Sequence, residues 1–311
     1  MKTKLILVFL VLISFYPAAG KIKYMDGSKW KVFGRFEYGS SSSFYDLNSD
    51  QKIFERDTFN IIIEDSIPYQ YVLKHTYELK EYILNPRIEY AIANDFTVYA
   101  EIPLMWQSYV NKFEKDTNRF SPTYGQQTIR AEYSAFIPKY YGLGGYIRLN
   151  KGILTSSLLF GMQLPPKLKN GYQQDTTNNF YIYNTYKFYA GLVSTLNMKK
   201  SFLELETTYM YRGGDFGDMF RLRLEGGFTS VPHTAIKGLC IYDVNLSGFE
   251  DAQRVNPRMT TLKEDALDVG ASFEIEIAEM INLEFAYLIG IGIKNSLNYG
   301  RLIINTSILL N

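Results

Sequence analysis

The chain has 311 residues, with 33 basic and 32 acidic side chains and a formal net charge of +1. This balance excludes a strongly basic surface, so no nucleic-acid partner is expected. The one cysteine, Cys240, excludes an intramolecular disulfide and a cysteine-based metal site. Aromatic residues make up 16% of the chain and charged residues 21%, a composition typical of amphipathic strands.

Residues 1–20 have the pattern of a cleavable secretory signal. Lys2 and Lys4 precede an apolar run at 5–16, which is about half of the roughly 20 residues that a membrane-spanning helix needs. The small residues Ala18 and Gly20 suit a cleavage site directly after Gly20. We therefore expect export, a signal peptide at 1–20 and one domain at 21–311, with an N-terminal membrane anchor as the alternative.

Beyond residue 20, no apolar stretch is long enough for a transmembrane helix. The best candidate, 281–293, is too short and contains Glu284. An exported chain of this kind is a soluble periplasmic protein, a secreted protein or an outer-membrane protein.

Alternation of apolar and polar residues favours the last of these classes. From 84 to 92, apolar residues alternate with polar ones, and after the turn Asn94-Asp95 the alternation continues to 104. Segments of about ten such residues are what a strand tilted across a bilayer requires. The same pattern recurs at 203–212, 220–229, 267–277, 283–291 and 301–310.

The connections between these segments alternate in length. The short connections are 94–95, 150–152, 198–200, 231–234 and 279–282, and the long ones are 109–125, 165–183, 213–218 and 247–265. Short turns on one rim and long loops on the other are typical of an outer-membrane barrel, with the short turns periplasmic.

The predicted fold is therefore all-β, a closed antiparallel transmembrane β-barrel with short periplasmic turns and long extracellular loops. We expect about 14 strands, or 12 if 53–80 pairs less regularly, since bacterial barrels have even numbers of strands. The stretch 126–150 is either one long bent strand or a strand plus a separate segment. Because a free sheet edge is costly in hydrocarbon, the first strand, near 30–40, should pair with the last, near 299–310. Outward aromatic residues near strand ends suit interface girdles: Tyr90, Phe96, Tyr209, Tyr211 and Tyr287.

Two segments resemble a known family. The hairpin at 86–104, PRIEYAIANDFTVYAEIPL, is similar to that of transporter-like outer-membrane barrels associated with phenol meta-cleavage pathways, and GMQLP at 161–165 resembles their later strand end. The resemblance implies passage of small, often hydrophobic or aromatic, molecules across the outer membrane of a Gram-negative cell. The chain ends in Leu310-Asn311 without the terminal aromatic residue common in barrel assembly signals, and only 21–29 precede the first strand, too few for an N-terminal plug.

Charged residues on the inward parity are the candidate pore lining. Glu204 and Glu206 are expected near Arg221 and Arg223 on the neighbouring strand, where a charge ladder would shape selectivity or close a narrow pore. The alternative is a merely polar interior. The candidate lumen residues are Arg87, Glu89, Glu101, Arg130, Glu132, Glu204, Glu206, Arg221, Arg223, Glu225, Glu274, Glu276, Glu284 and Arg301.

Two further features bear on metal binding and catalysis. Glu276 and Glu284 are expected opposite each other across 279–282, as a weak cation-attracting rim, unless the register is offset by two residues. A loop from Asp46 to Asp57 resembles a calcium loop but lacks its glycine and final glutamate. We expect no metal and no cofactor. The chain has two histidines: His233 lies in the turn 231–234, away from a lumen acid or serine, and His75 shares the parity of Tyr71, Leu73 and Tyr77, which favours packing. We therefore expect no enzyme.

The leading hypothesis is a porin-like channel or transporter in the outer membrane for small solutes, hydrophobic or aromatic by resemblance. The alternative is a structural or adhesive barrel with a closed lumen and partner-binding loops. The expected partners are outer-membrane lipid, a small-molecule solute and the barrel assembly machinery.

Overall fold

The computed structural model describes residues 29–45, 51–53, 55–56, 75–113, 131–166, 173–175, 180–182, 186–198, 200–213, 217–229, 233–246, 265–278, 281–291 and 297–310. The predicted signal peptide, Arg130 and most of the candidate calcium loop lie outside these residues. The described part of the chain contains no helix that is long and apolar enough to cross a membrane.

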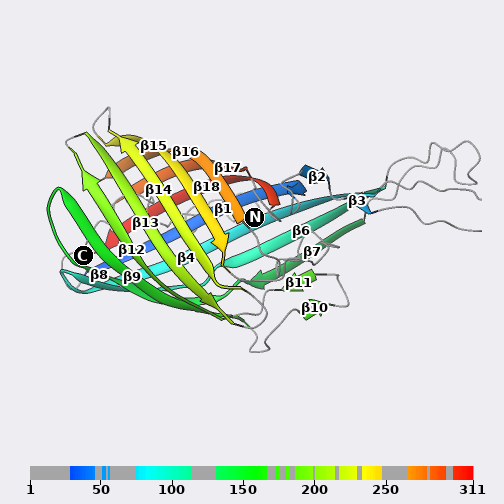
Figure 1. Ribbon diagram of the computed structural model, residues 1–311, viewed down its shortest axis with the longest axis horizontal. Coiled ribbons are helices and arrows are strands. Elements are labelled where there is room, and N and C mark those ends of the chain that lie inside the picture. The colour runs from blue at the N-terminus through cyan, green and yellow to red at the C-terminus, as the bar shows by residue number, and fades with distance from the viewer. Residues whose placement is uncertain are drawn as a thin grey trace, which may run out of the picture.

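Long antiparallel strands run obliquely around one barrel (Figure 1). Twelve positions form the closed ring. In chain order its strands are β1 (Trp30–Tyr45), β4 (His75–Ala93), β5 (Phe96–Glu101), β8 (Tyr141–Arg148), β9 (Leu154–Leu164), β12 (Lys187–Asn197), β13 (Ser201–Arg212), β14 (Met219–Phe228), β15 (Thr234–Asn245), β16 (Asp265–Ala278), β17 (Ile281–Gly290) and β18 (Leu297–Leu310).

The barrel closes between the first and last strands, as predicted. Trp30 of β1 lies opposite Leu310 of β18, and the pairing continues along both strands. On its other edge β1 pairs directly with β4, from Trp30 opposite Tyr90 to Ser41 opposite Leu79. This direct pairing leaves no room in the ring for strands from 53–74, so the expectation of about 14 strands was wrong and the count of 12 was right. Closure also excludes a two-sheet sandwich.

Two ring positions continue into outer segments on the long-loop side. β6 (Leu104–Phe113) follows β5 after Ile102 and Pro103, and β7 (Ala131–Pro138) precedes β8. Proline has no N–H to donate to a ladder, and the two interruptions fall at Pro103 and directly after Pro138. The two interruptions lie at one level, because the Lys139 N–H donates to the Pro103 carbonyl at 2.7 Å. Residues 131–148 thus form a single interrupted strand position, and β4 pairs with both β5 and β6.

Four short strands complete the described elements. They are β2 (Gln51–Ile53), which pairs with β1, β3 (Glu55–Arg56), which pairs with β4, and the separate pair β10 (Gln173–Asp175) and β11 (Phe180–Ile182).

The distribution of burial is inverted relative to that of a water-soluble protein. Glu89, Glu225 and Lys237 are 1–2% exposed, while Ile236, Ile277 and many other large apolar side chains are more than half exposed. A contiguous exposed apolar surface marks contact with another apolar phase. Because the exposed parity faces outward, the barrel carries an apolar belt around a polar interior, as hydrocarbon requires.

Aromatic side chains pair on the outer face at both ends of the barrel. The ring centroids of Trp30 and Tyr90 lie 4.5 Å apart near the short turns, with the rings tilted by 36°. Nearer the long loops, the Tyr82 ring centroid lies 5.0 Å from that of Tyr38 and 5.5 Å from that of Trp106. Such pairs suit the two interfaces of a membrane. The predicted girdle residues Tyr209, Tyr211 and Tyr287 are 43–53% exposed.

Candidate functional site

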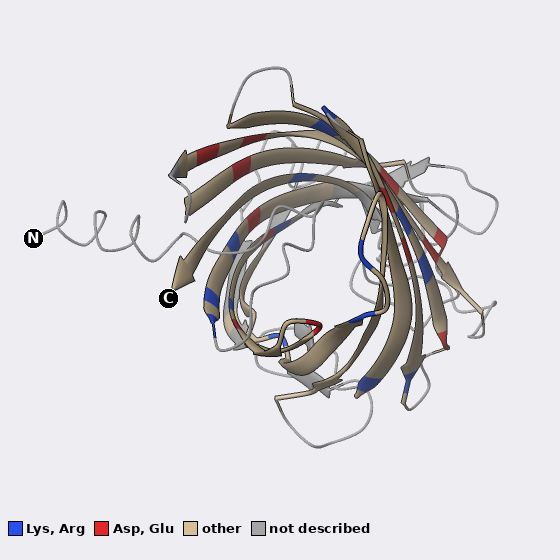
Figure 2. Ribbon diagram, turned by 90° about the vertical axis from the view of Figure 1, so that its left-hand side faces the viewer, with Lys and Arg blue, Asp and Glu red and all other residues tan. Residues whose placement is uncertain are grey.

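The candidate site is the charged lining of the barrel. Figure 2, a view along the barrel, shows both Lys and Arg and Asp and Glu on strands on different sides of the ring. Of the fourteen candidate residues, twelve have described side chains, and all twelve lie on the same parity as the buried polar residues of their strands. Arg130 is not among the described residues, and Glu132 lies in β7 with no described side chain.

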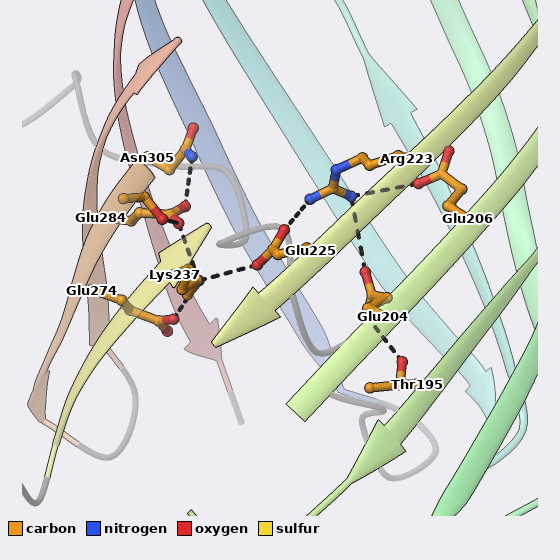
Figure 3. Close-up of polar contacts among 10 residues, drawn as sticks. Thr195, Glu204, Glu206, Arg223, Glu225, Lys237, Glu274, Glu284 and Asn305 are labelled. Atoms are coloured by element: carbon orange, nitrogen blue, oxygen red, sulfur yellow. Dashed lines mark hydrogen bonds and ion pairs between the residues drawn. The ribbon is translucent and has the colours of Figure 1, made fainter. Parts of the chain in front are cut away.

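Arg223 of β14 holds three carboxylates together. Its guanidinium lies 3.4 Å from Glu206 and 3.8 Å from Glu204, both on β13, and forms an ion pair with Glu225 of its own strand. Thr195 of β12 donates to the second oxygen of Glu204 at 2.9 Å. These contacts extend across three neighbouring strands (Figure 3). The planar guanidinium, with donors pointing in several directions, is suited to such sharing.

Lys237 of β15 is the second centre. Its ammonium lies 2.6 Å from Glu274, 3.0 Å from Glu284 and 3.7 Å from Glu225, which also contacts Arg223. The two centres are therefore joined through Glu225 (Figure 3). Ser272 donates to Glu284 at 2.6 Å and Asn305 donates to it at 2.8 Å, which extends the cluster to β18. We call the residues around Arg223 and Lys237 the ionic network.

Charge is not balanced within the ionic network. Five carboxylates, Glu204, Glu206, Glu225, Glu274 and Glu284, surround the two cations Arg223 and Lys237. Lys237 is 2% exposed, so its charge is compensated by contacts and not by water. The network is thus an acidic band on one wall of the interior, and it depends on two cations for its cohesion.

The predicted ladder forms only in part. Arg223 contacts both Glu204 and Glu206, whereas Arg221 lies opposite Thr208 and pairs instead with Asp243 of β15 through two hydrogen bonds of 2.7 Å each. The register places Arg221 two residues closer to the long loops than the pair Glu206 and Arg223, so Arg221 is near Glu206 but bonds to Asp243. At a similar level Arg301 pairs with Asp268 and lies 3.5 Å from Glu37.

The opposite wall combines a charge pair with tyrosines. Arg87 of β4 forms an ion pair with Glu89, and Tyr146 of β8 donates to Glu89 at 2.5 Å. The Arg87 guanidinium lies 3.5 Å from the centre of the Tyr99 ring, a cation–π contact. Here each carboxylate has a cation or hydroxyl of its own, and Glu101 likewise accepts from Tyr140 at 3.0 Å.

Close packing of this wall depends on glycines. A Cβ at Gly144 would lie 2.5 Å from the Tyr99 ring and 2.7 Å from the Phe160 carbonyl oxygen, and Gly161 lies under the hydroxyl end of Tyr189. Tyr99 and Tyr189 meet through their hydroxyls across these glycines. The two rings therefore lie flat against the wall because the glycines beneath them lack side chains.

The short-turn rim corrects two expectations. Glu284 lies opposite Glu274, and Glu276 lies opposite Asn282, so the pairing of Glu276 with Glu284 was wrong by the two-residue offset weighed above. His233 was expected away from any lumen acid, yet its Nδ1 lies 3.4 Å from Glu276. Its φ of 65° turns the backbone so that the ring approaches β16, a feature with no signal in the sequence pattern.

Several lining residues are absent from the sequence-based candidates. Lys237 alternates with Ile236 and Gly238, so parity alone would have found it. Tyr99 and Tyr146 were passed over because the candidate lining was restricted to charged residues. An inner apolar patch was also missed, because it breaks the rule of polar inward positions: Leu239, Ile241, Ala286, Leu288 and Ile303.

The arrangement places fixed charges along both walls of the interior. Among the described residues, no group of three or more His, Cys, Asp or Glu side chains has the geometry of a metal site. The carboxylates of the ionic network are held by Arg, Lys, Ser, Thr and Asn side chains, an arrangement that fixes charge along a wall.

Comparison with known proteins supports the fold. No family model matches the chain, and no curated protein matches it. Among solved structures it is similar to the COG4313 outer membrane channel from Pseudomonas putida F1, with a TM-score of 0.59, 11% sequence identity and coverage of 94% of this chain and 100% of that chain. The chain therefore has the closed antiparallel barrel fold of an outer-membrane channel.

Two further structures are more distant. The translocator domain of the autotransporter NalP from Neisseria meningitidis has a TM-score of 0.48 at 8% identity, covering 91% of this chain and 89% of that chain. A deltaS2 mutant of the TodX monoaromatic hydrocarbon channel has a TM-score of 0.47 at 10% identity, covering 93% and 91%. Of the three, only the COG4313 channel has a TM-score above 0.5.

Proposed function

We propose that the chain is exported by its N-terminal signal peptide, spans the outer membrane and allows small solutes to pass, with hydrophobic or aromatic molecules as the solute class. The observation that carries this proposal is the inverted burial of a closed barrel, with charge inside and apolar side chains outside. The fold shared with an outer-membrane channel supports it. The outer-membrane lipid and the barrel assembly machinery are the partners that such a fold requires.

The mixed interior supports the solute class. A pore for water and ions alone gains nothing from leucine and isoleucine on its inner wall, yet Leu239 and Ile241 of β15 pack there against Leu288 and Ile303. The rings of Tyr99 and Tyr146 line the opposite wall, with centroids 6.4 Å apart. Leu288, Ile303, Tyr99 and Tyr146 are nearly buried, so the partly exposed Leu239 and Ile241 are the apolar surface that a hydrophobic solute would meet, while the charged rows keep the rest of the interior polar.

A variant of the inner apolar patch tests the solute class. Replacing Leu239 by Gln and Ile241 by Thr makes the patch polar on partly exposed positions, so the barrel should still fold. Uptake of radiolabelled naphthalene by Gram-negative cells producing this double variant should be several-fold slower than with the natural chain, while arabinose permeation should be unchanged.

The control is an outward double variant, Ile236→Val with Tyr242→Phe, produced at the same level and checked for heat-modifiable migration on gels. We expect it to transport naphthalene like the natural chain. Equal naphthalene uptake by cells with the natural chain and cells without it would contradict the proposal and favour a structural barrel.

A further inference from the structure

A lysine at the long-loop end of the lumen has no counter-ion in the described structure. Lys187 is the first residue of β12 and shares the inward parity of Val193 and Thr195, which are 3% and 6% exposed. Its strand neighbours are Gln163 on β9 and Arg212 on β13. Within the described residues, no hydrogen bond or ion pair joins the Lys187 ammonium to an acceptor.

The charges around Lys187 are mostly of its own sign. Arg212 lies directly opposite, where its guanidinium donates to the Gly217 carbonyl at 2.5 Å and to the Asn245 amide oxygen at 2.9 Å. Lys139 and Arg221 also repel the ammonium, whereas Asp243 attracts it. Asp243 is already bound by Arg221 through two hydrogen bonds of 2.7 Å. Like charges directly opposite each other in a sheet are destabilising. An anion placed between Lys187 and Arg212 would relieve this repulsion.

Below the two cations, the lining is aromatic and apolar. The next inward pair on the same two strands is Tyr189 and Met210, which lie opposite each other. Met210 is 8% exposed, and Tyr189 is held by the hydroxyl of Tyr99. The thioether and the ring are the next side chains of the inward parity, two residues, or roughly 7 Å, further along the strands.

We propose that Lys187 and Arg212 bind the carboxylate of a small organic acid at the long-loop end of the lumen, and that Tyr189 and Met210 contact its apolar body. The carboxylate accepts a charge-assisted hydrogen bond from the Lys187 ammonium, and the positive charge of Arg212 attracts it without giving up the hydrogen bonds to Gly217 and Asn245. An aromatic acid suits the site better than an inorganic anion because the surface beneath the cations is apolar. As a first stop for a solute, the site rests on the proposed channel function, but the binding itself does not.

Calorimetry on the detergent-folded full chain tests the site, with benzoate as the probe and benzyl alcohol as its uncharged counterpart. Benzoate should bind at least about tenfold more tightly than benzyl alcohol, since a charge-assisted hydrogen bond is worth more than a neutral one. K187Q should reduce benzoate affinity by about tenfold or more, and K187R should retain most of it. The matched control is K151Q, which removes an exposed lysine from the short-turn end, and it should bind benzoate like the natural chain.

The apolar contact has its own variant. M210S should weaken benzoate binding and leave acetate binding unchanged, because acetate does not reach the thioether. Equal affinities for benzoate and benzyl alcohol, or unaltered benzoate binding by folded K187Q, would overturn the proposal. Because binding in detergent needs no passage through a membrane, benzoate binding without any solute uptake would contradict the channel and leave this site standing.

Discussion

The two walls of the barrel interior hold their charges in different ways. On β13 to β18, the five carboxylates of the ionic network share Arg223 and Lys237. On β4 to β8, Glu89 contacts both the Arg87 guanidinium and the Tyr146 hydroxyl, so one carboxylate has two partners. Removing a cation that several carboxylates share destabilises all of them, whereas a carboxylate with two partners keeps one of them when the other is removed. The ionic wall should therefore respond to one substitution far more strongly than the tyrosine wall.

Removing the Lys237 cation should have the largest effect. Lys237→Met leaves Glu225, Glu274 and Glu284 without their common cation in a buried position, and the expected loss is about 3–5 kcal/mol of unfolding free energy. Urea unfolding in detergent, followed by tryptophan fluorescence, measures it. Lys151→Met, an exposed lysine 3.2 Å from Asp95, should leave the midpoint unchanged. A Lys237→Met midpoint equal to that of the natural chain would show that the network does not hold this wall.

On the tyrosine wall, the expected loss is smaller. Tyr146→Phe removes one hydrogen bond to Glu89, which keeps its ion pair with Arg87, so we expect about 1.5–3 kcal/mol. The same unfolding assay applies. Tyr242→Phe is the matched control, since that outward side chain has no hydrogen bond within the described structure, and its stability should not change. If Tyr146→Phe cost more than Lys237→Met, the contrast between the walls would be reversed.

Packing beneath the tyrosines gives a comparable but purely steric effect. Gly144→Ala forces Tyr99 away from the wall and presses on a carbonyl oxygen that cannot yield, with an expected cost of about 1–3 kcal/mol. Gly238→Ala is the control, because a Cβ there meets nothing within 4 Å. Equal stability of the two alanine variants would mean that Tyr99 does not lie against Gly144.

The smallest effect should come from the short-turn rim. Hydrogen bonds from Arg148 and Lys151 hold the pKa of Asp95 below its ordinary value. A carboxyl with a lowered folded pKa contributes stability above its unfolded pKa of about 3.9, and this is lost as pH falls through the folded pKa. Unfolding midpoints measured between about pH 5 and pH 2 should fall slightly less for Asp95→Asn than for the natural chain. Identical pH profiles would exclude a contribution from Asp95.

Regular alternation made most of the fold predictable from the sequence. The hairpin around Asn94-Asp95 and the pairing of the first strand with the last follow from parity and from the need to close the sheet. The strand number did not follow, because apolar residues in 53–80 read as strand, while the direct pairing of β1 with β4 is a long-range contact without a local signal.

The lining was predictable by parity but not by partner. Inward positions such as Glu204 and Arg223 are fixed by a period of two residues, whereas the choice between Glu206 and Asp243 as partner of Arg221 depends on register. A shift of two residues keeps every side chain on its face, so no hydrophobic penalty reveals it. The same degeneracy explains the misplaced pairing of Glu276 and Glu284. The charges around Lys187 come from β13, β14 and β15 and from Lys139, so no single segment of the sequence displays them together.

Conductance of the purified, detergent-folded chain in a planar lipid bilayer tests the central claim most directly. An apolar belt around a polar interior predicts spontaneous insertion and discrete, reproducible current steps. The Lys237→Met variant should shift the reversal potential in a salt gradient further toward cation preference, since it leaves a larger excess of carboxylates on the wall. Protein that co-floats with lipid vesicles yet gives no current steps would contradict a lumen open to small solutes.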